Sequence, residues 1–176
     1  GVLYSLFNVE SDDFTLPTPT KPGYDFIGWV AGGTSDVYST VTITKGTVGN
    51  QAYTAKWKAN GNTPYTVNIY YMDVNGQYKE VPDITRTEAG ETDTTATVPS
   101  SAYTKNGFSY DDAKSSDSGT ITGDGKLQLS LYYARNQYDI AFKSYDGSET
   151  LYSYKGYYGT EITFQGNKPV IKDEDY

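Results

Sequence analysis

The sequence predicts a mostly β protein, built from small modules in tandem and with little helix. The first observation is composition: 15% of the 176 residues are aromatic, 19 of them are Tyr, and 18 residues are Gly. Aromatic and β-branched side chains suit a pleated sheet, and Gly, Asn and Asp suit its turns. The second observation is that apolar and polar residues alternate in short runs. The third is that no window shows sustained helical spacing of apolar residues.

The residue types that are missing exclude several classes of function. The chain has no His and no Cys, so a Ser-His-Asp triad, a Cys-His pair, a zinc finger and a disulfide are excluded. With 14 Lys and Arg against 22 Asp and Glu, the net charge is −8. This argues against nucleic acid as a partner, because phosphates require a basic surface. No run approaches the roughly 20 apolar residues of a membrane helix, so we expect no membrane insertion.

Internal similarity divides the chain into three segments, 1–60, 61–136 and 137–176. The matching stretches are Lys21–Phe26 with Lys105–Tyr110, Tyr53–Asn60 with Leu129–Asn136, and Tyr65–Ile69 with Tyr138–Phe142. The first pair shares the pattern Lys-x-Gly-aromatic-x-aromatic, and the second pair consists of alternating strands that run to Asn. The connections between segments are short, so we expect a semi-rigid array.

The first and third segments each lack part of this pattern. The first has no opening strand of the kind at 65–71, and the third stops at Asp173–Tyr176 before any Lys-x-Gly-aromatic element. We therefore interpret the chain as a piece of a longer array. Exposed strand edges invite pairing with another chain, so a further hypothesis is strand-complemented self-association.

Alternation assigns strand faces within each segment. The residues expected to face inward are Tyr53, Ala55 and Trp57 in the first segment; Tyr65, Val67, Ile69, Tyr71, Leu127, Leu129, Leu131 and Tyr133 in the second; and Tyr138, Ile140 and Phe142 in the third. Two turns are expected at Asp73–Gly76 and Asp146–Gly147, with return strands at Gln77–Val81 and Thr150–Tyr154. A single helical turn is expected around Ser100–Tyr103.

The stretch Leu16–Trp29, continued by Val41–Asn50 and Tyr53–Trp57, closely resembles the internalin B-type (Listeria–Bacteroides) repeat. The resemblance rests on Gly-Tyr-x-Phe-x-Gly-Trp followed by Tyr-x-Ala-x-Trp, and it covers about 8–58 without the first strand of the family. Its signature residues are Gly23, Tyr24, Phe26, Gly28, Trp29 and Trp57. A ligand site is one interpretation of this signature. We favour core and turn roles, because aromatics between glycines at alternate strand positions usually pack.

Residues 64–136 resemble, more loosely, a mucin-binding-protein-like module, and residues 137–176 resemble the opening strands of a truncated further repeat. The resemblance implies β-grasp-like (ubiquitin-like) modules, whose first and last strands are central, parallel neighbours. It also implies a place along a Gram-positive cell-surface adhesin or stalk. The expected domains are therefore an internalin B-type repeat lacking its first strand (1–60), a mucin-binding-protein-like β-grasp module (61–136) and the truncated repeat (137–176).

Tyr70 and Tyr132 are predicted on the outer face of the second segment. If their strands are neighbours, the two rings form an aromatic pair that could stack on sugar rings, which is a glycan-contact hypothesis. The alternative, which we favour, is that outer-face tyrosines stabilise cross-strand pairs.

Acidic groupings offer no recognisable metal or catalytic site. Asp111, Asp112 and Asp117, and the run at 173–175, could bind Ca²⁺ through hard oxygen ligands, but their spacing fits no EF-hand. Solvated turn charge is the better interpretation. Two carboxylates could hydrolyse a glycoside without His, yet nothing in the sequence selects a pair. We therefore predict no enzyme, no catalytic residue, no metal and no cofactor.

These observations favour a non-catalytic repeat segment of an extracellular, cell-wall-associated bacterial surface protein, acting as a stalk or spacer and adhesion module. Its expected partners are neighbouring repeats of the same chain and host or matrix glycans and glycoproteins. The alternatives are a carbohydrate- or mucin-binding module that uses exposed tyrosines, and an accessory module of an extracellular enzyme.

Overall fold

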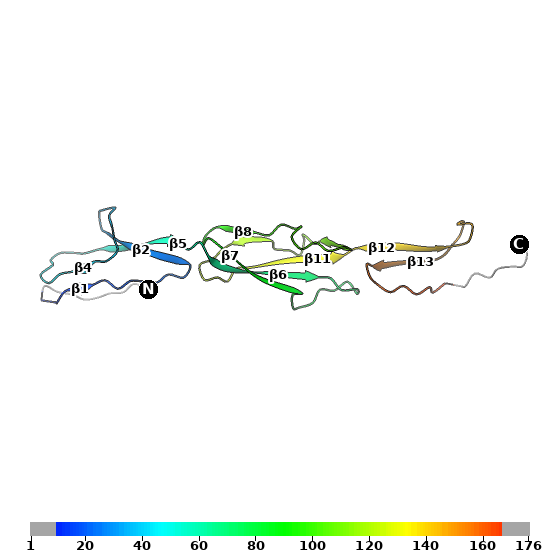
Figure 1. Cartoon of the computed structure of the whole chain (residues 1–176), viewed down its shortest axis with the longest axis horizontal. Helices are drawn as coiled ribbons and strands as arrows, with labels where there is room; N and C mark the ends of the chain where they lie inside the picture. The colour runs from blue at the N-terminus through cyan, green and yellow to red at the C-terminus, as the bar shows by residue number, and fades with distance from the viewer. Residues whose placement is uncertain (1–9, 167–176) are drawn as a thin grey trace, which may run out of the picture. The chain divides into compact units, whose positions relative to one another are not determined.

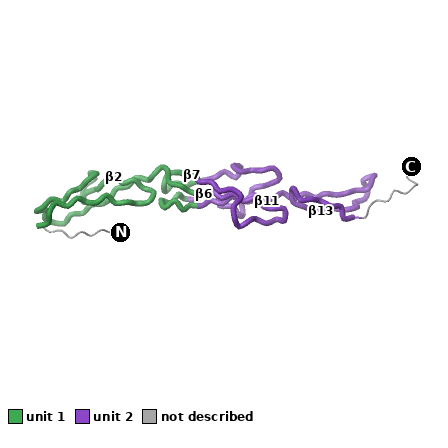
Figure 2. The backbone as a smooth tube through the Cα atoms, turned by 60° about the horizontal axis from the view of Figure 1, so that its bottom comes forward, with its two compact units in different colours: residues 1–65, 88–96, 120–127 green, residues 66–87, 97–119, 128–176 purple. Residues whose placement is uncertain are grey.

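The computed structural model describes residues 10–166, which form strands, turns and loops and no helix (Figure 1). The mostly β class is therefore confirmed. The chain divides into two compact units (Figure 2): residues 1–65, 88–96 and 120–127 form unit 1, and residues 66–87, 97–119 and 128–176 form unit 2. The expected lack of a first strand and the acidic run at 173–175 fall outside the described residues. Within the described part of the chain, no helix is long and apolar enough to cross a membrane.

The first 60 residues contribute two small sheets to unit 1. Their strands are β1 (Phe14–Thr15), β2 (Tyr24–Ala31), β3 (Val37–Tyr38), β4 (Thr42–Ile43) and β5 (Tyr53–Ala59). One sheet has the order β3-β2-β5, and β1 pairs with β4 in the other. The inward side chains of β5 are half-buried, as alternation predicts, while Val41 and Ile43 are buried.

A four-stranded sheet of order β7-β6-β11-β9 follows, with a separate pair β8-β10. The bounds are β6 (Thr63–Tyr71), β7 (Ile84–Gly90), β8 (Thr95–Thr97), β9 (Phe108–Tyr110), β10 (Ser118–Thr120) and β11 (Gln128–Arg135). Strands β6 and β11 are parallel neighbours, with Leu129 opposite Val67 and Leu131 opposite Ile69. This pairing agrees with what the β-grasp resemblance implies, although the β-grasp assignment itself stays a proposal.

The core of unit 2 lies on one face of the β6–β11 pair. Its fully buried side chains are those of Val67, Ile69, Leu129, Leu131 and Tyr133. All five occupy positions that period-two alternation assigns to the inner face. Each apolar side chain removed from water in this way contributes about 1.5–3 kcal/mol of transfer free energy.

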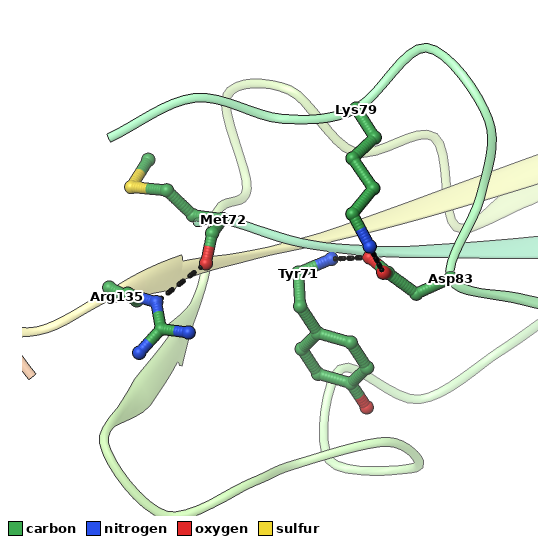
Figure 3. A network of polar contacts seen from close by, with 5 residues as sticks. All are labelled: Tyr71, Met72, Lys79, Asp83 and Arg135. Carbon is green, nitrogen blue, oxygen red and sulfur yellow. Dashed lines mark hydrogen bonds and ion pairs between the residues drawn. The ribbon is translucent and has the colours of Figure 1, made fainter. Parts of the chain in front are cut away.

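The expected return strand at Gln77–Val81 is wrong, although the turn before it is present. The carboxylate of Asp73 accepts the amide protons of Asn75 at 2.8 Å and Gln77 at 2.9 Å, which fixes a loop. The amide of Tyr71 then donates to Asp83 Oδ2 at 2.8 Å, and Lys79 pairs with the same carboxylate (Figure 3). A side chain thus takes the place of a strand carbonyl, and the next strand, β7, begins only at Ile84.

The third segment forms a two-stranded hairpin of β12 (Gln137–Lys143) and β13 (Thr150–Tyr157). The Asp146–Gly147 turn and the return strand are confirmed, and Gly147 has a φ of 73°. Tyr138 departs from its expected inward position and is 50% exposed, because no described strand covers that end of the hairpin. The helical turn expected around Ser100–Tyr103 is instead an isolated turn, closed by the Ala102 amide and the Pro99 carbonyl at 2.9 Å.

We expect Leu131→Ala to lower the free energy of unfolding by about 2–5 kcal/mol, because it leaves a cavity beside the parallel strand pair. Urea denaturation followed by tyrosine fluorescence measures this change. Val81→Ala is the matched control: Val81 is 72% exposed, so its truncation should change stability by less than about 0.5 kcal/mol. Equal effects of the two substitutions would contradict the assignment of the core.

Candidate functional site

The outer face of the β6–β11 pair carries a cluster of tyrosines. Parallel pairing places Tyr132 opposite Tyr70, as the glycan-contact hypothesis requires. Their rings stack at a centroid distance of 4.5 Å and an interplanar angle of 6°. Strand neighbours of this kind stabilise a sheet through their side chains.

Tyr78 is a third member of this cluster that the sequence did not single out. Its ring meets Tyr132 edge to face at 5.0 Å and 84°, and its hydroxyl donates to Asp111 Oδ2 at 3.0 Å. The ammonium group of Lys114 lies 5.8 Å from the Tyr78 ring. Tyr78 lies in the loop that the sequence pattern predicts as a strand. Periodicity therefore does not indicate the direction of its side chain.

Stacking decides how much of this cluster a ligand can reach. Tyr70, Tyr78 and Tyr132 are all half-buried, and the rings of Tyr70 and Tyr132 each use one face on the other. The cluster is therefore an upright stack and not a flat aromatic platform. This geometry supports the cross-strand role directly and leaves only part of each ring for contact with a sugar.

Three aspartates of unit 2 are bonded to tyrosine hydroxyls or turn amides. Asp111 accepts the Tyr78 hydroxyl, and Asp117 accepts the Tyr110 hydroxyl at 2.9 Å. The turn carboxylate of Asp73 accepts amide protons, first that of Gln77, which lower its pKa. Within residues 10–166, no three acidic side chains gather into a group that could hold a metal ion.

Phe26, Trp29 and Trp57 of the first segment form a packed aromatic cluster. Phe26 meets both Trp29 and Trp57 edge to face, at 5.5 Å in each case. Strict alternation would place Phe26 and Trp29 on opposite faces of β2. A bulge between Phe26 and Gly28 inserts one residue and returns Trp29 to the face of Phe26.

Gly28 is the residue that permits this bulge. Its φ is 153°, and a Cβ there would lie 2.7 Å from the carbonyl oxygen of Tyr38 on β3. Tyr24 is not part of the cluster: its hydroxyl donates to the carboxylate of Asp93, and the Lys21 ammonium lies 3.4 Å from its ring centroid. The bond to Asp93 is the main cause that raises the pKa of Tyr24.

Comparison with known proteins adds no relative: no family model, no curated protein and no solved structure matches the chain.

The tyrosine cluster makes stability sensitive to alkaline pH. Burial, followed by the bond to Asp111, raises the pKa of Tyr78 well above its usual value. A raised pKa means that the neutral ring stabilises the fold fully below about pH 10, the unfolded value. That contribution is lost as pH rises through the raised pKa of the folded state.

We therefore expect ultraviolet titration of the folded chain to contain a late tyrosine ionisation whose amplitude Tyr78→Phe reduces. Tyr145 is fully exposed, so Tyr145→Phe is the control and should leave the late step in place. A late step of unchanged amplitude in Tyr78→Phe would contradict the assignment.

Proposed function

We propose that this chain is a non-catalytic repeat segment of an extracellular bacterial surface protein, acting as a spacer and adhesion module. The observation that carries the proposal is the shortness of the connections between its segments. Residues 60–62 alone join β5 to β6, and residue 136 alone joins β11 to β12. Connections of one to three residues are too short to act as flexible linkers, whereas long Gly/Ser-rich linkers behave as flexible coils.

Two further observations support this proposal. The parallel β6–β11 pair is consistent with a β-grasp-like module, the type that the resemblance to internalin B-type and mucin-binding-protein-like repeats implies. The net charge of −8 favours the solubility of a chain exposed at a cell surface.

The spacer role predicts that the chain lifts an attached group out of a crowded layer. We would anchor the chain by its C-terminus to a surface grafted with a polymer layer and place an epitope at its N-terminus. Antibody capture should exceed that of the same epitope coupled directly to the surface, and a flexible Gly/Ser linker of equal length should perform less well. Capture no better than direct coupling would overturn the spacer role.

A carbohydrate- or mucin-binding role is a second candidate, favoured by the contiguous, half-buried rings of Tyr70, Tyr132 and Tyr78. If it holds, wild-type protein binds a glycan or mucin array, and the double variant Tyr70→Ala/Tyr132→Ala loses binding while retaining a cooperative thermal melt. Tyr145→Ala is the matched control and should bind as the wild type does. Silence of the folded wild type on the array would overturn this second candidate.

A further inference from the structure

The two Lys-x-Gly-aromatic turns close on the last residue of their own segments in the same way. Gly23 and Gly107 both have positive φ, 75° and 80°. The carbonyl of Gly23 accepts the amide proton of Asn60 at 2.9 Å, and that of Gly107 accepts the amide proton of Asn136, also at 2.9 Å. The aromatic residue after each glycine has an equivalent partner, since Tyr24 pairs with Ala59 and Phe108 with Arg135. The first turn lies in unit 1 and the second in unit 2.

The side chain of each asparagine repeats the correspondence. Asn60 Nδ2 donates to Asp25 Oδ1 at 3.3 Å, and Asn136 Oδ1 accepts the Ser109 hydroxyl at 2.7 Å. Asp25 and Ser109 occupy the same position, two residues after the turn glycine. Each asparagine is therefore held to its turn by both backbone and side chain.

Each asparagine also bonds to the segment that follows it. The carbonyl of Asn60 accepts the amide proton of Thr92 at 3.0 Å, and that of Asn136 accepts the amide proton of Tyr158 at 2.8 Å. Thr92 comes just after β7, and Tyr158 comes directly after β13. In both cases the donor residue comes just after the second long strand of the next segment. The end of that strand lies beside the connection between the two segments.

Residues of the following segment, the donor among them, then cover the turn glycine. The Thr92 hydroxyl donates to the Gly23 carbonyl at 2.7 Å, and a Cβ on Gly23 would lie 2.3 Å from the Cα of Gly123 and 2.8 Å from Thr92 Oγ1. A Cβ on Gly107 would lie 2.1 Å from the Tyr158 ring. Since contacts below 3.0 Å force a shift, only glycine permits this approach at both positions.

Each joint also has a side-chain hydrogen bond to a charged group, although the residues that form it differ between the two joints. In unit 1, the Tyr24 hydroxyl donates to Asp93, the neighbour of Thr92. In unit 2, Arg135 donates through Nη1 to the Tyr158 carbonyl and through Nε to the Met72 carbonyl at 2.8 Å (Figure 3). These contacts are charge-assisted, and such bonds are stronger than those between neutral groups.

We propose that the Lys-x-Gly-aromatic turn and the closing asparagine form a module joint, whose partner is the residue after the second long strand of the next module. The two joints are Gly23–Asn60–Thr92 and Gly107–Asn136–Tyr158. In each, the glycine carbonyl, the asparagine and the donor amide form one continuous chain of hydrogen bonds. The joint ties the connection between two modules to the end of the second long strand of the next module. This inference deepens the proposed spacer function and rests on it for its biological purpose.

Two matched glycine substitutions in the full chain test the second joint. Gly107→Ala and Gly147→Ala both place a Cβ at positive φ, 80° and 73°, but nothing lies within 4 Å of a Cβ at Gly147. We expect amide hydrogen exchange, measured by NMR, to be about tenfold faster at Asn136 and Tyr158 in Gly107→Ala. The amides of Val67 and Leu131 should keep their wild-type rates, and Gly147→Ala should leave all four unchanged.

A second pair of variants keeps the test decisive if Gly107→Ala disturbs β9. Tyr158→Ala removes the ring that covers Gly107 and should speed exchange at Asn136, whereas Tyr145→Ala at a fully exposed position should not. The joint is overturned if Gly107→Ala and Tyr158→Ala leave the Asn136 amide as protected as in the wild type. It is also overturned if the two controls expose that amide equally.

Exchange is measured on the free chain, so its outcome does not depend on whether the chain acts as a spacer. If the Asn136 amide behaves as the joint predicts but antibody capture is no better than direct coupling, only the proposed function is overturned. If antibody capture is improved but the Asn136 amide does not behave as predicted, only the joint is overturned.

Discussion

Parallel pairing of β6 and β11 is the constraint on which unit 2 depends. The two strands are far apart in the sequence, and bringing them together buries Val67, Ile69, Leu129 and Leu131 completely. The same register stacks Tyr132 on Tyr70 on the opposite face. One pairing therefore creates both the apolar core and the aromatic surface, and a change in register by a single residue would exchange the two faces.

Glycine controls how closely the strands and turns of this chain approach one another. Gly28 admits a bulge under a neighbouring strand and so aligns Phe26 with Trp29. Gly23 and Gly107 admit a residue from the following segment at distances that no Cβ would allow. The stretch from Gly23 to Trp29 thus combines two physical roles: Phe26 and Trp29 pack within the segment, while Gly23 contacts Thr92 of the next segment.

Tyrosine hydroxyls take over much of the polar pairing in a chain without His or Cys. Tyr24, Tyr78 and Tyr110 each donate to an aspartate that lies in a loop, and these bonds help to hold the loops in place. The acidic groupings that resemble cation ligands are therefore partly committed to structural bonds.

The sequence by itself determined the β class, the strands β5, β6, β11 and β12, the inner faces of the central pair and the turn at Asp146–Gly147. These features follow from local alternation and turn chemistry, which neighbouring residues carry. Only the tertiary structure decided that Tyr78 joins the tyrosine cluster, that a bulge reverses Trp29, and that Asn60 and Asn136 bond to Thr92 and Tyr158. Each of these features depends on a contact with a residue that is distant in the sequence. Local periodicity does not indicate which distant residue makes that contact.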